Sequence, residues 1–233
     1  MKTKNSVIRL GIITTTLVMT LSFYGCSKEN ETAVPSTNSD LLKEATLNYS
    51  QPENTTYVSS VSSLPIEELS EAEAASLIYM REEEMLAHDV YLALSQLYTK
   101  PVFKNITKSE AFHTEAIRLL LVKYNLSDPA TGHITGTFSN PDLQALYNSL
   151  LATGSESLLK GLTVGATIED LDIYDLENHL LDVDNRDITF VYTNLMNGSK
   201  NHLRAFYANI VFLGGTYTPQ FITQEEFNAI VNN

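Results

Sequence analysis

Five residues of the kinds that bind iron or manganese interrupt apolar stripes along this chain. They are Glu84, Glu110, His113, Glu169 and His202. Apolar residues at helical spacing mark the face that a helix buries, so these side chains are expected in a protein interior. Several unpaired carboxylates are costly to bury together, because they lose hydration and repel one another. Lys and Arg are scarce at the same stripe positions, which favours bound metal over internal salt bridges.

The spacing of Glu110 and His113 indicates what kind of metal centre to expect. Residues three apart lie on one helix face, so both side chains point toward the same place. Di-iron and di-manganese proteins build their sites from such Glu-x-x-His pairs together with carboxylates from neighbouring helices. Mixed oxygen and imidazole ligands suit iron or manganese. The sequence therefore predicts a site for two iron ions, with manganese as the alternative metal.

Neighbouring residues have less demanding roles. His88 lies one helical turn beyond Glu84 and is expected to support the ligands as a hydrogen-bond donor or as an additional ligand. Tyr91 is expected to pack near the site with a hydrogen bond. Glu82 and Glu83 lie about 100° or more around the helix from Glu84, which places them on a solvated face.

Four long helices must position the ligands. The apolar stripes cover residues 77–98, 106–124, 158–180 and 188–210, and shorter helices are expected at 141–152 and after Thr223. Ser70 with Glu73 fits a capping box, Pro101 separates the first two stripes, and glycines 214 and 215 end the last one. Four such helices in one small domain predict an all-α fold, an antiparallel four-helix bundle with short extra helices.

Four segments carry a resemblance to a known family. They are "REEEMLAHDVYLAL", "NITKSEAFHTEAIRLLLVKY", "VGATIEDLDIYDLENHL" and "YTNLMNGSKNHLRAFY". Between Leu77 and Ile230 the chain resembles an uncharacterised prokaryotic domain family of the ferritin-like superfamily. More distantly it is similar to the rubrerythrins, whose first-helix pattern matches Glu84, Ala87 and Tyr91. The resemblance implies a ferritin-like fold and metal ligation by the five residues named above.

The chain departs from that family pattern in its last long helix. A second Glu-x-x-His pair is usual there, but the residue three before His202 is Ser199. Asp172, one turn after Glu169, is the expected substitute, and Ser199 is expected near the ligands without binding metal itself. Four carboxylates would then balance the charge of two divalent cations. Without Asp172, one metal or an asymmetric pair is expected.

The N-terminal part reads as a targeting segment. Residues 1–25 combine basic residues with an apolar stretch, as in a bacterial lipoprotein signal peptide, and Cys26 is the expected site of lipidation. Residues 26–66 are rich in Ser, Thr, Asn, Glu and Pro, which predicts a flexible tether. Residues 67–233 form the ferritin-like domain. The expected location is the bacterial cell envelope, outside the cytoplasm, held to the membrane by a lipid anchor.

Composition limits the function classes. A net charge of −13 argues against binding to nucleic acid and against general attraction to anionic lipid, and a single cysteine excludes an internal disulfide framework. Two classes stay open. One is a di-metal oxidoreductase that acts on oxygen, peroxide or ferrous iron, with a small-molecule oxidant as partner. The other is a non-catalytic, surface-anchored helical binding module with a structural or lost metal site. A homodimer is compatible with both.

Overall fold

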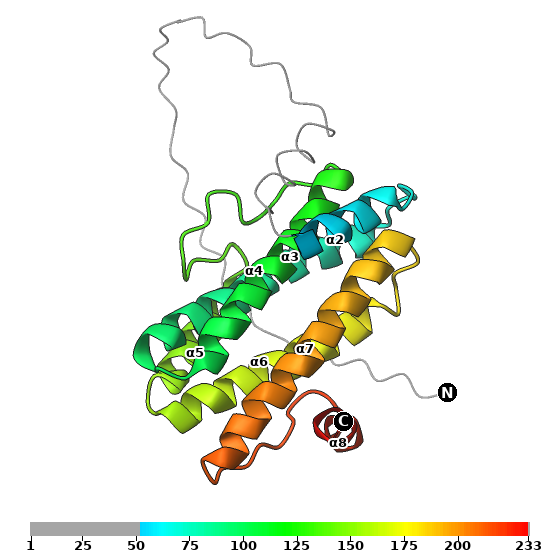
Figure 1. Cartoon of the computed structure of the whole chain (residues 1–233). Helices are drawn as coiled ribbons and strands as arrows, with labels where there is room; N and C mark the ends of the chain where they lie inside the picture. Colours follow the sequence, from blue (N-terminus) through cyan, green and yellow to red (C-terminus); the bar gives the residue numbers. More distant parts are fainter. Residues whose placement is uncertain (1–51, 233) are drawn as a thin grey trace, which may run out of the picture. The chain divides into compact units, whose positions relative to one another are not determined.

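The protein is described here by a computed structural model that places residues 52–232, and the leader and Cys26 lie outside this range. The described part of the chain is helical throughout, without a strand (Figure 1). Its helices are α2 (Pro52–Ser63), α3 (Glu71–Leu97), α4 (Pro101–Lys123), α5 (Pro141–Gly154), α6 (Leu158–His179), α7 (Arg186–Phe212) and α8 (Gln224–Val231). The predicted all-α class is confirmed. No helix within residues 52–232 is both long and apolar enough to cross a membrane.

Local sequence signals account for the helix ends. The Ser70 hydroxyl accepts a hydrogen bond from the Glu73 N–H, and the Glu73 carboxylate accepts one from the Ser70 N–H, so the predicted capping box begins α3. Asn140 caps α5 with its side chain. Gly214 follows α7 with φ of +75°, a left-handed conformation that glycine adopts without strain.

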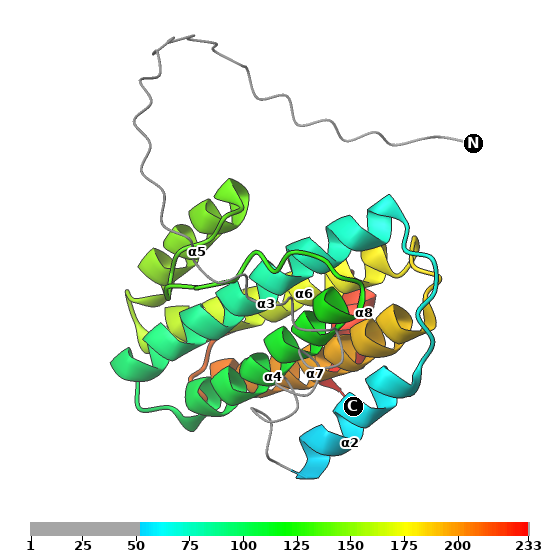
Figure 2. The same ribbon diagram turned by 90° about the horizontal axis from the view of Figure 1, so that it is seen from above.

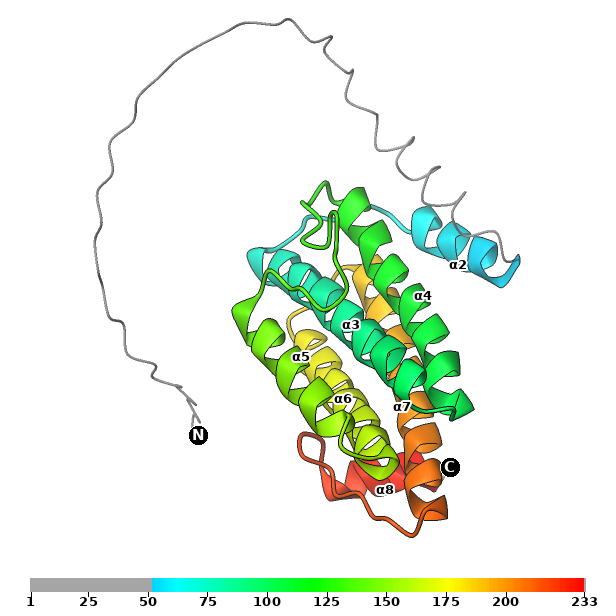
Figure 3. The same ribbon diagram turned by 90° about the vertical axis from the view of Figure 1, so that its left-hand side faces the viewer.

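The four long helices pack around a shared interior. α3 lies along α4, α6 lies along α7, and contacts of α4 with α7 and of α3 with α6 complete the arrangement (Figure 3). Buried aromatic and aliphatic side chains fill the space toward both ends, with Phe103 and Phe206 at one end and Ile117 and Tyr192 at the other. Between these two apolar regions lies the level of the acidic and histidine side chains.

The shorter helices cover the outside of this core. α5 packs on α3 and α6, α2 lies on the side of α4 and α7, and α8 packs on α7 (Figure 2). The tether prediction differs from the structure at residues 52–63, which form α2. Val58 and Val61 are buried there, and the buried Lys123 ammonium donates to the carbonyls of Val61 and Leu64. Two buried valines and a charged partner on a distant helix are enough to order a segment that its composition alone would leave unfolded.

Two loops are held by carboxylates from the middle of long helices. Glu82 accepts hydrogen bonds from the N–H groups of Ser139 and Asn140, and Asp89 accepts one from Gly136. Asp170 on α6 accepts four hydrogen bonds from the loop between α7 and α8. The prediction that Glu82 is solvated is wrong. A helix-face argument that considers only helix packing cannot detect a loop that folds over the outer face.

Candidate metal centre

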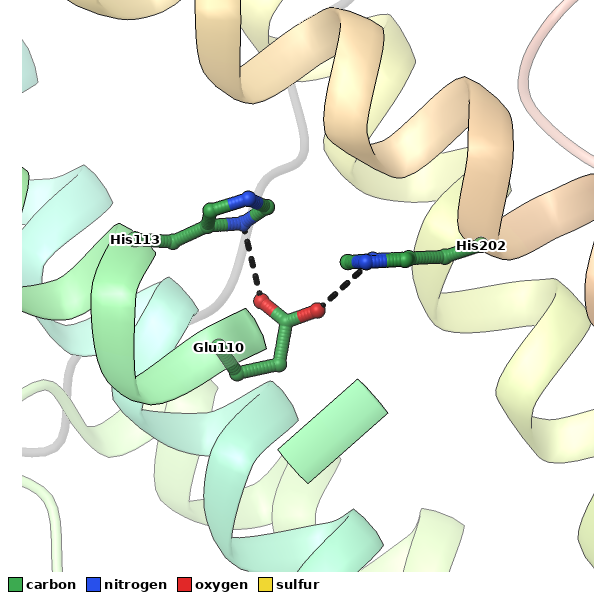
Figure 4. A group of neighbouring side chains, drawn as sticks. All are labelled: Glu110, His113 and His202. Atoms are coloured by element: carbon green, nitrogen blue, oxygen red, sulfur yellow. Dashed lines mark ion pairs between the residues drawn. The ribbon is translucent and has the colours of Figure 1, made fainter. Parts of the chain in front are cut away.

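The structure brings the sequence-predicted ligands together at one level of the interior. Glu84 comes from α3, Glu110 and His113 from α4, Glu169 and Asp172 from α6, and His202 from α7. All six side chains are buried. Glu110, His113 and His202 form the tightest part, because each offers one ligand-type atom and these atoms lie within 4.8 Å of one another (Figure 4).

Glu110 lies between the two histidine rings, as Figure 4 shows. Its Oε2 is 3.1 Å from Nδ1 of His113, and its Oε1 is 2.8 Å from Nδ1 of His202. Nδ1 of His113 is also 3.2 Å from Oε2 of Glu84, and Nδ1 of His202 is 3.4 Å from Oε2 of Glu169. Each histidine therefore faces a pair of carboxylates, and Glu110 belongs to both pairs.

Neighbouring groups fix the orientation of the carboxylates and rings. The Tyr91 hydroxyl donates to Oε1 of Glu169 at 2.6 Å, which matches the hydrogen bond expected for this tyrosine. The Ser199 hydroxyl donates a hydrogen bond to Asp172. Gly198 leaves room for His113, because a Cβ added there would lie 2.6 Å from Nε2 of the ring. α7 thus approaches α4 closely through a glycine next to the serine.

The pKa values of the two histidines and of Glu110 shift in opposite directions. Burial disfavours charge, yet Glu169 and Glu110 outweigh it and raise the pKa of His202 to about 10. Glu110 and Glu84 likewise raise the pKa of His113 well above its usual value. The Glu110 pKa falls below its ordinary range, because the two imidazolium charges overcome its burial. In the absence of metal, Glu110 is thus an anion between two cations.

The remaining carboxylates tend toward their neutral forms. Burial, reinforced by Asp172, raises the pKa of Glu84 well above its ordinary value. Burial and the charge of Glu169 raise the pKa of Asp172 to about 7, against the lowering effect of the Ser199 hydrogen bond. Protons and imidazolium groups thus supply the positive charge that a metal would otherwise provide.

Several buried polar atoms of this site lack a hydrogen bond that a bound metal would replace. Oε1 of Glu84, Oδ1 of Asp172, Oε1 of Glu110 and Nδ1 of His202 are buried without a hydrogen bond of acceptable geometry. The last two approach within ion-pair distance, but the ring N–H does not point along a hydrogen bond to the oxygen. Buried polar atoms usually have a partner, so the two without even an ion pair, Oε1 of Glu84 and Oδ1 of Asp172, call for one. Carboxylate oxygens and imidazole nitrogens are ligands for iron and manganese.

Two residues lie where the sequence did not place them. His88 is partly exposed, and its Nδ1 is 3.0 Å from Oδ1 of Asp89. The other oxygen of Asp89 pairs with His133. His88 belongs to the group that holds the loop before α5. Glu83 is buried, contrary to the prediction of a solvated side chain, and it lies against Asp175 of α6. Burial and the charge of Asp175 raise the pKa of Glu83 well above its ordinary value, which favours its neutral form.

Sequence and structure comparisons connect this site to an uncharacterised group. The family described as Uncharacterized protein domain (DUF2202) matches residues 73–233. An uncharacterized protein of Methanocaldococcus jannaschii is 50% identical over 173 residues, which cover 74% of this chain and 94% of the relative. The crystal structure of a hypothetical protein from that organism has a TM-score of 0.72 at 50% identity, covering 73% of this chain and 98% of the other.

Proposed function

The chain belongs to the DUF2202 family, and we propose that it is a ferritin-like four-helix-bundle protein whose central carboxylates and histidines bind two iron ions. Manganese is the alternative metal. The ligands proposed are Glu84, Glu110, His113, Glu169, Asp172 and His202. The observation that carries this proposal is the convergence of buried carboxylates and imidazoles from four helices, with one oxygen each of Glu84 and Asp172 left without a hydrogen bond.

The ligand set agrees with two divalent cations. Glu84, Glu110, Glu169 and Asp172 offer four negative charges when ionised, which neutralise two such ions. Glu110 has one oxygen directed to each histidine, so this one carboxylate would help to hold both ions. Asp172 is proposed to replace the carboxylate that is missing at Ser199. The hydrogen bond between the side chains of Asp172 and Ser199 supports this.

The chemistry proposed is the reaction of a reduced metal pair with oxygen or peroxide, or the oxidation of ferrous iron. When bound, the metals would supply the electrons for this reaction. The protein's own contribution is to hold the ligands in a water-poor interior and to orient Glu169 through the Tyr91 hydroxyl. Raised carboxyl pKa values at Glu84 and Asp172 provide groups that can hold protons near neutral pH.

Elemental analysis of protein purified without added metal tests the proposal, together with its optical spectrum under air. We expect about two iron or manganese ions per chain. Glu110→Gln keeps the side-chain size but removes a charge and a strong ligand, so it should lose metal and stay folded. His113→Ala and His202→Ala should lose metal as well, whereas Asp172→Asn should reduce the content from about two ions toward one.

Glu115→Gln is the matched control on the same helix, because Glu115 pairs with Arg118 at the surface of α4. It should leave metal content unchanged. Glu82→Gln is not a neutral control, since Glu82 holds the loop before α5. If Glu110→Gln and Asp172→Asn contain as much metal as the parent protein, the di-metal proposal is wrong.

A second function has one observation in its favour. The His113 and His202 cations balance Glu110 without any metal, so the cluster is electrostatically tolerable as a core of ion pairs. The protein would then be a non-catalytic helical binding module. Protein without metal after incubation with ferrous iron or manganese, and with the same thermal stability before and after, would support this function instead.

We also propose that Cys26 is lipidated and holds the protein to the cell envelope, outside the cytoplasm. Support comes from the basic and apolar residues that precede this single cysteine. Cys26→Ala should release the protein into the periplasm or the medium. A variant that stays membrane-bound after a salt wash would contradict lipid anchoring.

A further inference from the structure

Acidic residues are nearly absent from one end of this acidic protein. Residues 90–109 contain Lys100, Lys104 and Lys108 but no Asp or Glu. Residues 143–168 contain Lys160 and a single acid, Glu156, and residues 205–224 contain no charged residue. The chain as a whole carries 28 acidic residues against 15 basic ones. Its negative charge is therefore concentrated elsewhere.

These segments meet at the same end of the four long helices. Figure 3 shows the turn between α3 and α4, the start of α6 and the end of α7 together at its lower edge. The Lys100 ammonium lies 5.1 Å from the ring centre of Phe212. The Tyr98 hydroxyl donates to the Gly154 carbonyl at 2.9 Å, which joins the end of α3 to the end of α5.

Large apolar side chains are exposed among these lysines. They are Leu97, Leu159, Val211, Phe212 and Leu213. Phe212 is 79% exposed, although it is among the most apolar residues of α7. With Lys100, Lys104 and Lys160, these residues define the basic apolar end. A patch of exposed apolar side chains ringed by charge is typical of a surface that contacts another phase or molecule.

The direction of α2 along α4 follows from its contacts. The carbonyls of Val61 and Leu64 bind Lys123 at the far end of α4, whereas Tyr57 packs on Phe112 in the middle of α4, with ring centres 4.8 Å apart. The first residue of α2 therefore points toward the basic apolar end. The 25 residues between Cys26 and α2 could reach roughly 80–90 Å when extended.

We propose that the basic apolar end rests on an anionic lipid surface. Lys100, Lys104 and Lys160 would lie at the phosphate headgroups, while Phe212 and its neighbours enter the interface. Charges beyond about 10 Å are screened at 0.1 M salt, so the acidic remainder of the protein does not prevent this local attraction. Burial of apolar side chains and attraction to anionic headgroups together hold such a surface on a membrane, whether or not Cys26 is lipidated.

The absence of tryptophan makes the proposal directly measurable. The probe protein is the chain from Ser27 onward, which keeps all of the described residues 52–232 and carries no Cys26. Phe212→Trp introduces one fluorophore at the basic apolar end. Vesicles of equal phosphatidylglycerol and phosphatidylcholine at 0.1 M salt should shift its emission to shorter wavelength, and vesicles of phosphatidylcholine alone should not.

Ile66→Trp is the matched control. Ile66 is 67% exposed and precedes Glu67, which pairs with Arg186 at the opposite end of the long helices. Its emission should not shift with either kind of vesicle. Charge reversal at Lys100, Lys104 and Lys160 together should weaken vesicle binding at least about 100-fold, because loss of each lysine charge alone costs about fivefold. The same reversal of Arg186 should have no effect.

Three results would overturn the proposal. One is an unshifted Phe212→Trp emission with anionic vesicles. Another is vesicle binding that survives the triple lysine reversal. The third is a shift that depends on protein concentration and not on lipid, which would assign this end to contact with a second copy of the chain.

Discussion

Glu110 connects the two halves of the candidate centre, because each of its oxygens faces a different histidine. In the absence of metal, Glu110 and Glu84 favour the protonated form of His113, and Glu169 and Glu110 favour that of His202. A metal ion and a proton therefore compete for the same ring nitrogens. This competition makes metal binding depend on pH far above the ordinary titration range of histidine.

We expect metal affinity to rise with pH between 6 and 8. The pKa values of His113 and His202 are raised, so both rings carry protons at neutral pH, and metal binding must release them. Each released proton changes affinity about tenfold per pH unit, which gives up to about 100-fold per unit for two. Competition with a chelator of known affinity at several pH values measures the slope. A slope near zero would contradict ligation by these histidines.

Gly198 should be indispensable for the position of His113. A methyl group there would lie 2.6 Å from Nε2 of the ring, closer than non-bonded contact allows. Gly198→Ala should displace the ring, reduce metal content and destabilise the fold by about 1–3 kcal/mol. Asn197→Ala changes an exposed neighbour and should have neither effect. Normal metal content in Gly198→Ala would show that His113 is not held as described.

At the scale of elements, the loops are attached to the long helices by buried carboxylates. Asp170 accepts hydrogen bonds from the Tyr217 hydroxyl and from the N–H groups of Gln220, Phe221 and Ile222. This single side chain organises the loop that leads to α8. Since the N–H groups point inward, loss of the carboxylate leaves several buried donors without acceptors.

Asp170→Asn should lower the free energy of unfolding by about 2–4 kcal/mol, because an amide has one acceptor oxygen and its NH2 group would face other donors. For a domain of this size the expected fall in Tm is roughly 5–10 °C. Asp182→Asn, on an exposed residue, is the control and should leave Tm within a degree or two. Equal Tm values for the two variants would show that the Asp170 hydrogen bonds add little stability.

Helix α2 should belong to the protease-resistant core. Val58 and Val61 are buried and Lys123 binds two carbonyls at its end, so local opening exposes apolar surface and a buried ammonium. Limited proteolysis followed by mass spectrometry should give a stable fragment that begins before Pro52. A fragment that begins after Leu64 would show that α2 is only loosely attached.

At the scale of the whole molecule, periodicity predicted the four long helices within a few residues of their ends. It also selected the side chains that meet at the centre, since ligand-type residues on buried faces are conspicuous in a sequence. It failed at Glu82 and Glu83, because their cover comes from the loop before α5 and from Asp175. It also failed at α2, whose order depends on partners more than fifty residues away.

Four consecutive charged residues of α3 are all buried, and each meets a different neighbour. Arg81 pairs with Asp128, Glu82 binds two loop N–H groups, Glu83 lies against Asp175, and Glu84 faces His113. One extra residue upstream would turn this run by about 100° and misplace every member at once. Length changes in the first half of α3 should therefore be far less tolerated, in laboratory libraries and among natural relatives, than substitutions at the same positions.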